Sequence, residues 1–120
     1  MNEMNIERLK SKINFNIKFW LEFENKSIMG AGWAKLLKTI NKKDVTSLTQ
    51  AAKECGYSYK YAWNILKRIE ERTTASPVST SKGGPGGGGS VELNEWGHEL
   101  LQIFTKLENE VESIKKNLKI

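Results

Sequence analysis

Two short helices joined by a tight turn are encoded by Ser47-Leu-Thr-Gln-Ala-Ala-Lys-Glu-Cys-Gly-Tyr-Ser-Tyr-Lys-Tyr-Ala-Trp-Asn-Ile-Leu-Lys-Arg-Ile69. Ser47, with Gln50 three residues later, is the pattern of a capping box that begins a helix. Gly56 ends that helix, because glycine readily adopts the left-handed conformation of many helix ends. Ser58 caps the next one. Apolar residues recur at helical spacing on both: Ala51, Ala52 and Cys55, then Ala62, Ile65, Leu66 and Ile69.

Two helices that cross over a short glycine-containing turn form a helix-turn-helix, whose second helix enters the major groove of DNA. Asparagine can pair with adenine, lysine and arginine with guanine or phosphate, and tyrosine hydroxyls with phosphate. These types occupy the positions outside the apolar stripe of the second helix: Tyr59, Lys60, Tyr61, Asn64, Lys67 and Arg68. The alternative interpretation is an ordinary solvated face in a helical protein.

The length and cysteine content of the chain limit the possible classes of protein. A chain of 120 residues is one small domain, without room for a separate effector domain of typical size. Its single cysteine, Cys55, offers neither a disulfide framework nor a cysteine-built metal site. Met1 to Lys12 lacks the continuous apolar run of a signal peptide or membrane span. We therefore expect a soluble, cytoplasmic protein.

The excess positive charge is concentrated in one part of the sequence. The formal net charge is +5, and residues 33–72 hold nine basic against four acidic residues, so the remaining portions balance. A basic patch on an otherwise balanced protein is typical of a protein that binds a polyanion. The alternative is a solvated, lysine-rich surface without a specific partner.

Strict alternation of apolar and polar residues begins at Ile13 and continues to Phe23. A period of two over eleven residues predicts a strand with one face in the core. Ile28-Met29 would pair back as a short return strand, which gives a small antiparallel β-hairpin over residues 13–29. A helix should follow, with an apolar stripe of Trp33, Leu36, Leu37 and Ile40.

Residues 78–93 have the composition of a wing, a β-hairpin placed after a recognition helix. Two short β-prone runs flank a tip that contains six of the ten glycines, and Lys82 lies at its base. Glycine lets backbone amides approach phosphates closely. A nucleotide-binding P-loop would end in Gly-Lys-Ser or Gly-Lys-Thr before a helix, whereas this tip leads through Gly89-Ser90 into a strand. The run 86–90 also matches a common engineered linker, which is the alternative interpretation.

A final long helix is predicted over residues 95–118, with Asn94 as its cap. Its apolar residues follow a heptad spacing, which predicts a coiled-coil partner. The first half, with Leu100, Leu101 and Phe104, should pack on the domain and the second half on another subunit. The predicted dimerisation residues are Phe104, Leu107, Val111, Ile114 and Leu118. Alternatively, the helix folds back entirely on its own domain.

From Gly30 to about Leu107 the chain resembles the N-terminal winged-helix domain of the molybdate-responsive regulators called ModE, which are related in this motif to LysR-type regulators. The most specific features are Ser58-Tyr59-Lys60 with Ala62-Trp63, followed by the glycine-rich wing. The resemblance also includes Ser47-Leu48 with Ala51-Ala52-Lys53, and Leu93 with Gly97 and Leu100-Leu101. It covers roughly two thirds of the chain.

The resemblance implies a winged-helix transcription factor that dimerises through its terminal helices. The family's molybdate-binding domains would follow where this sequence stops, at Ile120, so we expect no molybdate binding. No catalytic constellation surrounds His98, the only histidine, which we interpret as a surface residue. Cys55 lies on an apolar helix face and should fill space. We expect no enzyme activity, cofactor or metal.

The sequence therefore predicts one α+β, mostly helical domain over residues 1–120, a winged helix-turn-helix with an N-terminal β-hairpin (13–29), a helical core (33–72), a wing (78–93) and a C-terminal dimerisation helix (95–118). It should bind double-stranded DNA as a dimeric transcriptional regulator. Base edges would be approached by Tyr59, Lys60, Tyr61 and Asn64, and phosphates by Ser58, Lys67, Arg68 and Lys82. The alternative function is a protein-interaction adaptor on the same scaffold.

Overall fold

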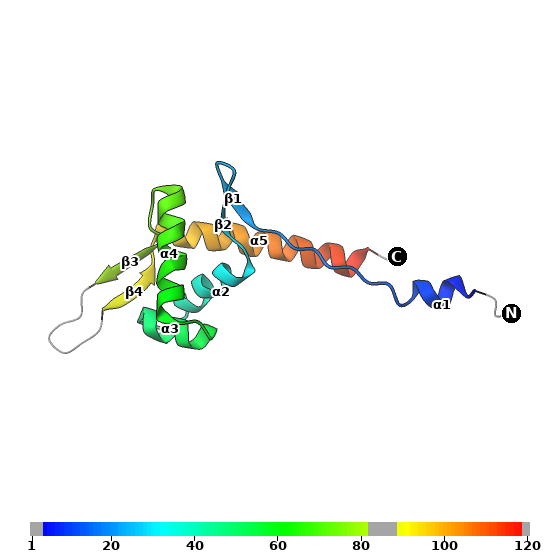
Figure 1. The fold of residues 1–120 in the computed structure, drawn as a ribbon, viewed down its shortest axis with the longest axis horizontal. Helices are drawn as coiled ribbons and strands as arrows, with labels where there is room; N and C mark the ends of the chain where they lie inside the picture. The colour runs from blue at the N-terminus through cyan, green and yellow to red at the C-terminus, as the bar shows by residue number, and fades with distance from the viewer. Residues whose placement is uncertain (1–3, 82–88, 119–120) are drawn as a thin grey trace.

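The computed structural model describes residues 4–81 and 89–118 of the chain. It is mostly helical and elongated, with extents of 78 × 30 × 22 Å (Figure 1). In chain order the elements are α1 (Ile6–Lys10), β1 (Leu21–Phe23), β2 (Lys26–Met29), α2 (Ala31–Ile40), α3 (Leu48–Cys55), α4 (Tyr59–Thr73), β3 (Val78–Ser81), β4 (Ser90–Leu93) and α5 (Glu95–Asn117). The predicted fold class, a mostly helical winged helix with two small hairpins, is confirmed.

The helix-turn-helix forms where the capping residues predict it. The Ser47 hydroxyl accepts the Gln50 N–H at 3.1 Å, and Gln50 Oε1 accepts the N–H of Thr46, one residue before the usual capping-box partner. Gly56 ends α3 with φ +76°, the left-handed conformation. Ser58 caps α4 by accepting the Tyr61 N–H.

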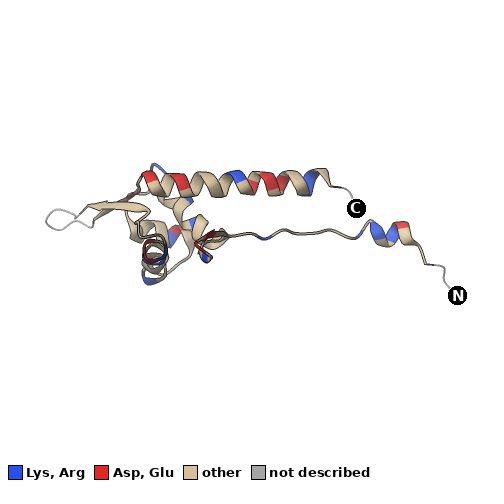
Figure 2. Cartoon of the chain, turned by 90° about the horizontal axis from the view of Figure 1, so that it is seen from above, with Lys and Arg blue, Asp and Glu red and all other residues tan. Residues whose placement is uncertain are grey.

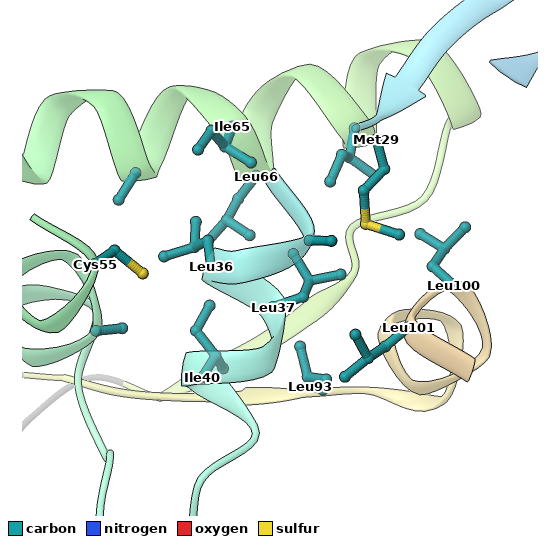
Figure 3. Packing of buried hydrophobic residues seen from close by; sticks show 14 of the residues in the cluster. Met29, Leu36, Leu37, Ile40, Cys55, Ile65, Leu66, Leu93, Leu100 and Leu101 are labelled. Carbon is teal, nitrogen blue, oxygen red and sulfur yellow. The ribbon is translucent and has the colours of Figure 1, made fainter. Parts of the chain in front are cut away.

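Apolar side chains from α2, α3 and α4 meet in one core (Figure 3). Ala51 and Ala52 on α3 and Ala62 on α4 are buried, and their small size lets the two helices approach closely. Cys55 is buried, with its Sγ 3.4 Å from the Thr39 hydroxyl. The larger buried side chains from these helices are Leu36, Leu37, Ile40, Ile65, Leu66 and Ile69.

The first hairpin is much shorter than the alternating pattern predicts. Only Leu21–Phe23 forms a strand, paired with Lys26–Met29 across a turn in which Glu24 and Asn25 have positive φ. The prediction of a strand from Ile13 was wrong for residues 13–20, which have no regular secondary structure. The return strand, Lys26–Met29, is too short to reach beyond Leu21. Within the described chain no other strand pairs with residues 13–20.

The wing is an antiparallel pair, with Val78 opposite Leu93 and Ser81 opposite Ser90. Val91 and Leu93 are buried against the core, and the Val91 N–H donates to the Thr46 carbonyl at 2.9 Å. The predicted wing strands are therefore present and tied to the start of α3. Lys82 and most of the glycine tip lie outside the described residues.

Helix α5 begins on the domain and then leaves it (Figure 1). Asn94 caps it, and Leu100, Leu101 and Phe104 are buried in the core. Lys38 on α2 forms an ion pair with Glu108 at 2.6 Å, after which the helix projects from the domain. The short helix α1 has no buried residue.

We predict that Gly97→Ala destabilises the domain by about 1–3 kcal/mol, although alanine favours helices, because the new Cβ would overlap the Pro77 carbonyl oxygen. Gly32→Ala is the matched control, since its Cβ would lie 3.4 Å from the Tyr57 hydroxyl. Urea unfolding of both variants measures the difference. Equal free energies of unfolding for Gly97→Ala and Gly32→Ala would contradict the close contact between Gly97 of α5 and the Pro77 carbonyl.

Candidate nucleic-acid interface

Helix α4 presents one continuous exposed face beside its buried stripe. Lys60, Asn64 and Lys67 follow one another at helical spacing along the middle of this face, and all three are exposed. Because Ala62, Ile65 and Ile69 fix the opposite side of the helix in the core, the exposed face cannot rotate inward. The face therefore has a defined orientation relative to the wing.

On one side of α4 a groove runs between the helix, the start of α3 and the wing. Its volume is about 1060 Å³. The side chains of Tyr59, Trp63, Lys67 and Glu70 lie in its α4 wall. Among the described residues, its other walls are lined by Thr46 to Thr49, by Ser76, Val78, Thr80 and Ser81, and by Gly89 to Val91. Trp63 is 47% exposed, with the Lys67 ammonium 5.9 Å from its ring centroid.

On the other side of α4 a smaller hollow of about 350 Å³ lies against the first hairpin. Its α4 wall includes Tyr61, Asn64, Arg68 and Arg72. Arg72 donates to the Ser27 carbonyl, which attaches the end of α4 to the hairpin. The exposed face of α4 thus lies between two hollows, of which the larger is lined by Lys67 and Glu70 and the smaller by Arg68 and Arg72.

Tyr57, in the turn, braces the N-terminal end of α4. Its hydroxyl donates to the Gly32 carbonyl at 2.8 Å, and its ring contacts Tyr61 edge-on at 5.0 Å. Partial burial raises the pKa of the Tyr57 phenol above 10.0, and charge on Cys55 and Tyr61 raises it further. Tyr57 is therefore neutral at pH 7 and holds the turn against α2.

The cations of α4 are not neutralised by acidic side chains. Ion pairs in residues 4–81 and 89–118 involve Lys38, Lys42 and Lys115, and leave Lys60, Lys67 and Arg68 unpaired. Figure 2 shows both acidic and basic bands along α5. Unpaired, exposed cations on one face attract a polyanion at low energetic cost, because no internal ion pair must be broken.

Comparison with known proteins identifies the relatives of the chain, although no family model matches it. It is 38% identical over 61 residues to the DNA-binding transcriptional dual regulator ModE of Escherichia coli, covering 51% of the chain and 23% of that protein. The molybdenum-pterin-binding protein MopB of Rhodobacter capsulatus is 35% identical over 80 residues, or 67% of the chain and 28% of MopB.

The transcriptional regulator ModE of Haemophilus influenzae is likewise 35% identical over 74 residues, which are 62% of the chain and 28% of that regulator. The chain carries a domain of the ModE type. It spans about a quarter of the length of the curated relatives that it matches.

The ModE-type domain brings seven of the eight predicted DNA-binding residues to one helix and its cap. They are Ser58, Tyr59, Lys60, Tyr61, Asn64, Lys67 and Arg68, and all are exposed. The Ser58 hydroxyl is already engaged with the Tyr61 N–H as the helix cap. The eighth residue, Lys82, lies outside the described part of the chain.

Two further residues of the α4 surface were missed. Trp63 was noted only as part of the resemblance, yet it lies in the wall of the wing groove. Its position outside the buried stripe was the available signal. Arg72 was counted only in the net charge, and its contact with the hairpin depends on a segment 45 residues earlier.

The predicted dimerisation residues of the ModE-type domain divide into two groups. Phe104 is buried in the core, where its ring lies 4.7 Å from that of Phe19, so in this conformation it faces its own domain. The exposed group is Leu107, Ile114 and Leu118, with Val111 half-buried.

Other kinds of site were sought in the described ranges. In residues 4–81 and 89–118 no three His, Cys, Asp or Glu side chains gather as metal ligands would, and His98 is exposed. Within the same ranges no helix combines the length and the hydropathy required to cross a bilayer.

We predict that Tyr57→Phe lowers the free energy of unfolding by about 1 kcal/mol at pH 7, because the hydrogen bond to Gly32 is lost. The raised pKa of Tyr57 stabilises the fold below pH 10.0, and this contribution disappears as pH rises through the folded-state pKa. The difference between wild type and variant should therefore shrink in strong alkali. Tyr59→Phe, at an exposed position, is the control in urea unfolding. It should change neither the free energy of unfolding at pH 7 nor the dependence of that free energy on pH.

Proposed function

We propose that this ModE-type domain binds double-stranded DNA as a transcriptional regulator, with α4 in the major groove. The observation that carries the proposal is the exposed face of α4, where Lys60, Lys67 and Arg68 are unpaired among the described residues and surround Asn64. An α-helix fits the major groove, and these side-chain types recognise base edges and phosphates.

The N-terminal half of α4 would read the bases. Tyr59, Lys60, Tyr61 and Asn64 occupy its first two turns, the part of a recognition helix that reaches deepest into the groove. Asparagine can bind adenine through two hydrogen bonds, and lysine can bind guanine. Specificity should therefore depend on Lys60 and Asn64.

Phosphate contacts would come from the two sides of the helix. Lys67 borders the wing groove, and Arg68 borders the hollow beside the first hairpin. Each is thus directed towards a different flank of α4, as the two backbones of a major groove require. The wing would follow one of these backbones.

The proposal includes a homodimer held by the second half of α5. Leu107, Val111, Ile114 and Leu118 continue the heptad stripe beyond the domain core. A symmetric dimer would present two copies of α4 to half-sites about 34–36 Å apart, or a multiple of this distance.

We predict that Lys60→Ala weakens binding to the specific duplex by roughly tenfold or more, while the fold stays intact, because Lys60 is exposed and unpaired among the described residues. The measurement is fluorescence anisotropy with labelled duplex from the upstream region of the protein's own gene and with a scrambled duplex. Lys106→Ala, which removes the same charge from α5, is the control and should bind like wild type. Unchanged affinity of Lys60→Ala would remove α4 from the interface.

Salt dependence separates DNA binding from the adaptor alternative. Phosphate contacts release counterions, so affinity should fall by orders of magnitude between low and physiological salt. Weak, equal binding to both duplexes with little salt dependence would contradict the DNA-binding proposal for this duplex. Pull-down of a protein partner would then test the adaptor function.

We predict that Val111→Asp converts a sedimenting dimer into a monomer, because it places a charge in the apolar stripe of α5. Ser113→Asp adds the same charge at an exposed position outside this stripe and should leave the dimer intact. Sedimentation velocity measures both. A wild-type chain that already sediments as a monomer would contradict dimerisation through α5.

A further inference from the structure

The hollow of about 350 Å³ between α4 and the first hairpin, which we call the hairpin hollow, has only positive charge in its described lining. Its charged residues are Arg68 and Arg72, one helical turn apart, and no Asp or Glu lines it. Neither arginine forms an ion pair within residues 4–81 and 89–118. The groove beside the wing differs, because Lys67 shares its lining with Glu70. The hairpin hollow therefore attracts an anion more strongly than that groove does.

The first hairpin holds one of the two guanidinium groups in place. Arg72 is half-buried, and its Nη1 donates to the Ser27 carbonyl of β2. A guanidinium has five N–H donors, so most of them remain available to a ligand. Arg68 lies one turn earlier on the same side of α4 and is exposed. Two guanidinium forks can thus converge on a single anion.

The rest of the lining suits a phosphate group. Ser27, Tyr61 and Asn64 contribute a hydroxyl, a phenol and an amide, each of which can donate a hydrogen bond to a phosphate oxygen. Behind them lie Met29 and Ile65, each only 1% exposed. An apolar backing limits the water that would otherwise screen the attraction between the arginines and an anion.

The hairpin hollow adjoins the proposed DNA-reading surface. Asn64 belongs both to the exposed face of α4 and to the lining of the hollow. Figure 1 shows the first hairpin and the wing on opposite sides of α4. A helix in the major groove has a phosphate backbone on either side. The backbone that faces the first hairpin would therefore bring its phosphates to the hairpin hollow.

We propose that Arg68 and Arg72 together hold one phosphate of the DNA backbone in the hairpin hollow, so that the first hairpin flanks the DNA opposite the wing. This inference rests on the proposed function and adds Arg72 and the hairpin to its interface. A phosphodiester has two non-bridging oxygens, which two guanidinium groups can share. Because phosphate carries no base identity, the contact strengthens binding to every sequence alike.

The first experiment measures duplex affinity against salt concentration for Arg68→Gln with Arg72→Gln. Affinities for the specific and the scrambled duplex should fall by the same factor, roughly tenfold. The slope of log affinity against log salt concentration should decrease in magnitude by about 0.9, the value for one phosphate. A decrease of about 1.8, for two separate phosphates, or no decrease at all would overturn the inference. A loss confined to the specific duplex would assign both arginines to bases and would also overturn it.

Control variants separate the loss of charge from a change in the fold. Arg68→Lys with Arg72→Lys keeps both charges and should keep the wild-type salt slope, so a loss equal to that of the glutamine pair would contradict the proposal. Lys106→Gln with Lys116→Gln removes two charges from exposed positions of α5 and should also keep the slope. Arg68→Gln alone leaves the contact of Arg72 with Ser27 intact and should still weaken both duplexes by roughly threefold.

A second experiment identifies the source of the phosphate. In the ¹⁵N-labelled full chain, the Nε–Hε resonances of Arg68 and Arg72, assigned with the lysine variants, should shift when the scrambled duplex is added. Shifts that inorganic phosphate produces and the duplex does not would assign the hollow to a free anion and overturn the inference.

The failure of this inference and the failure of DNA binding have different signatures. If the hairpin hollow holds no phosphate but α4 binds DNA, Lys60→Ala still weakens binding to the specific duplex, and the glutamine variants of Arg68 and Arg72 bind like wild type. If the proposed function itself fails, the wild type binds both duplexes weakly with little salt dependence, and Lys60→Ala leaves that affinity unchanged as well.

Discussion

The close approach of α3 and α4 is the constraint on which the rest of the structure depends. It requires small side chains where the helices meet, and Ala51, Ala52 and Ala62 are buried there. Leu36 and Ile40 of α2 close the third side of the same core. With three sides fixed, only one face of α4 can remain outside, so the chemistry of that face follows from packing. A bulky residue at Ala51 would push α3 and α4 apart and so shift Lys60 and Asn64 relative to α3 and the wing.

The helix ends and buried faces could be predicted because their causes are local. Ser47, Gly56, Ser58 and Asn94 act on backbone groups within a few residues, and the structure confirms each of them. Alternation from Ile13 was a weaker guide because it says which residues share a face but not whether a partner strand is present. A strand requires inter-strand hydrogen bonds, and within the described chain β2 supplies them only opposite Leu21–Phe23.

The candidate site shows the same division between local and distant causes. Its central residues on α4 could be found by elimination, because they occupy the helix positions outside the apolar stripe. The walls of its two hollows could not, because they bring α4 together with the wing on one side and with β2 on the other. Trp63 could have been found from its position outside the buried stripe, whereas the contact of Arg72 with the hairpin depends on a distant segment that no spacing in the sequence indicates.

Positive and negative side chains gather on different elements of the molecule. Among the described residues Lys60, Lys67 and Arg68 lie unpaired on α4, whereas Glu108, Glu110 and Glu112 form an acidic run in the middle of α5 between Lys106 and Lys115. Near a polyanion such as DNA, α4 would be attracted and this part of α5 repelled, so the domain would approach with α5 pointing away. Lys38 pairs with Glu108 where α5 leaves the domain, so this carboxylate contributes less to the repulsion than Glu110 does. The outer part of α5 is then free to meet another chain without competing for the DNA surface. On the proposed function, DNA recognition by α4 and self-association by the outer part of α5 would use different parts of one small domain.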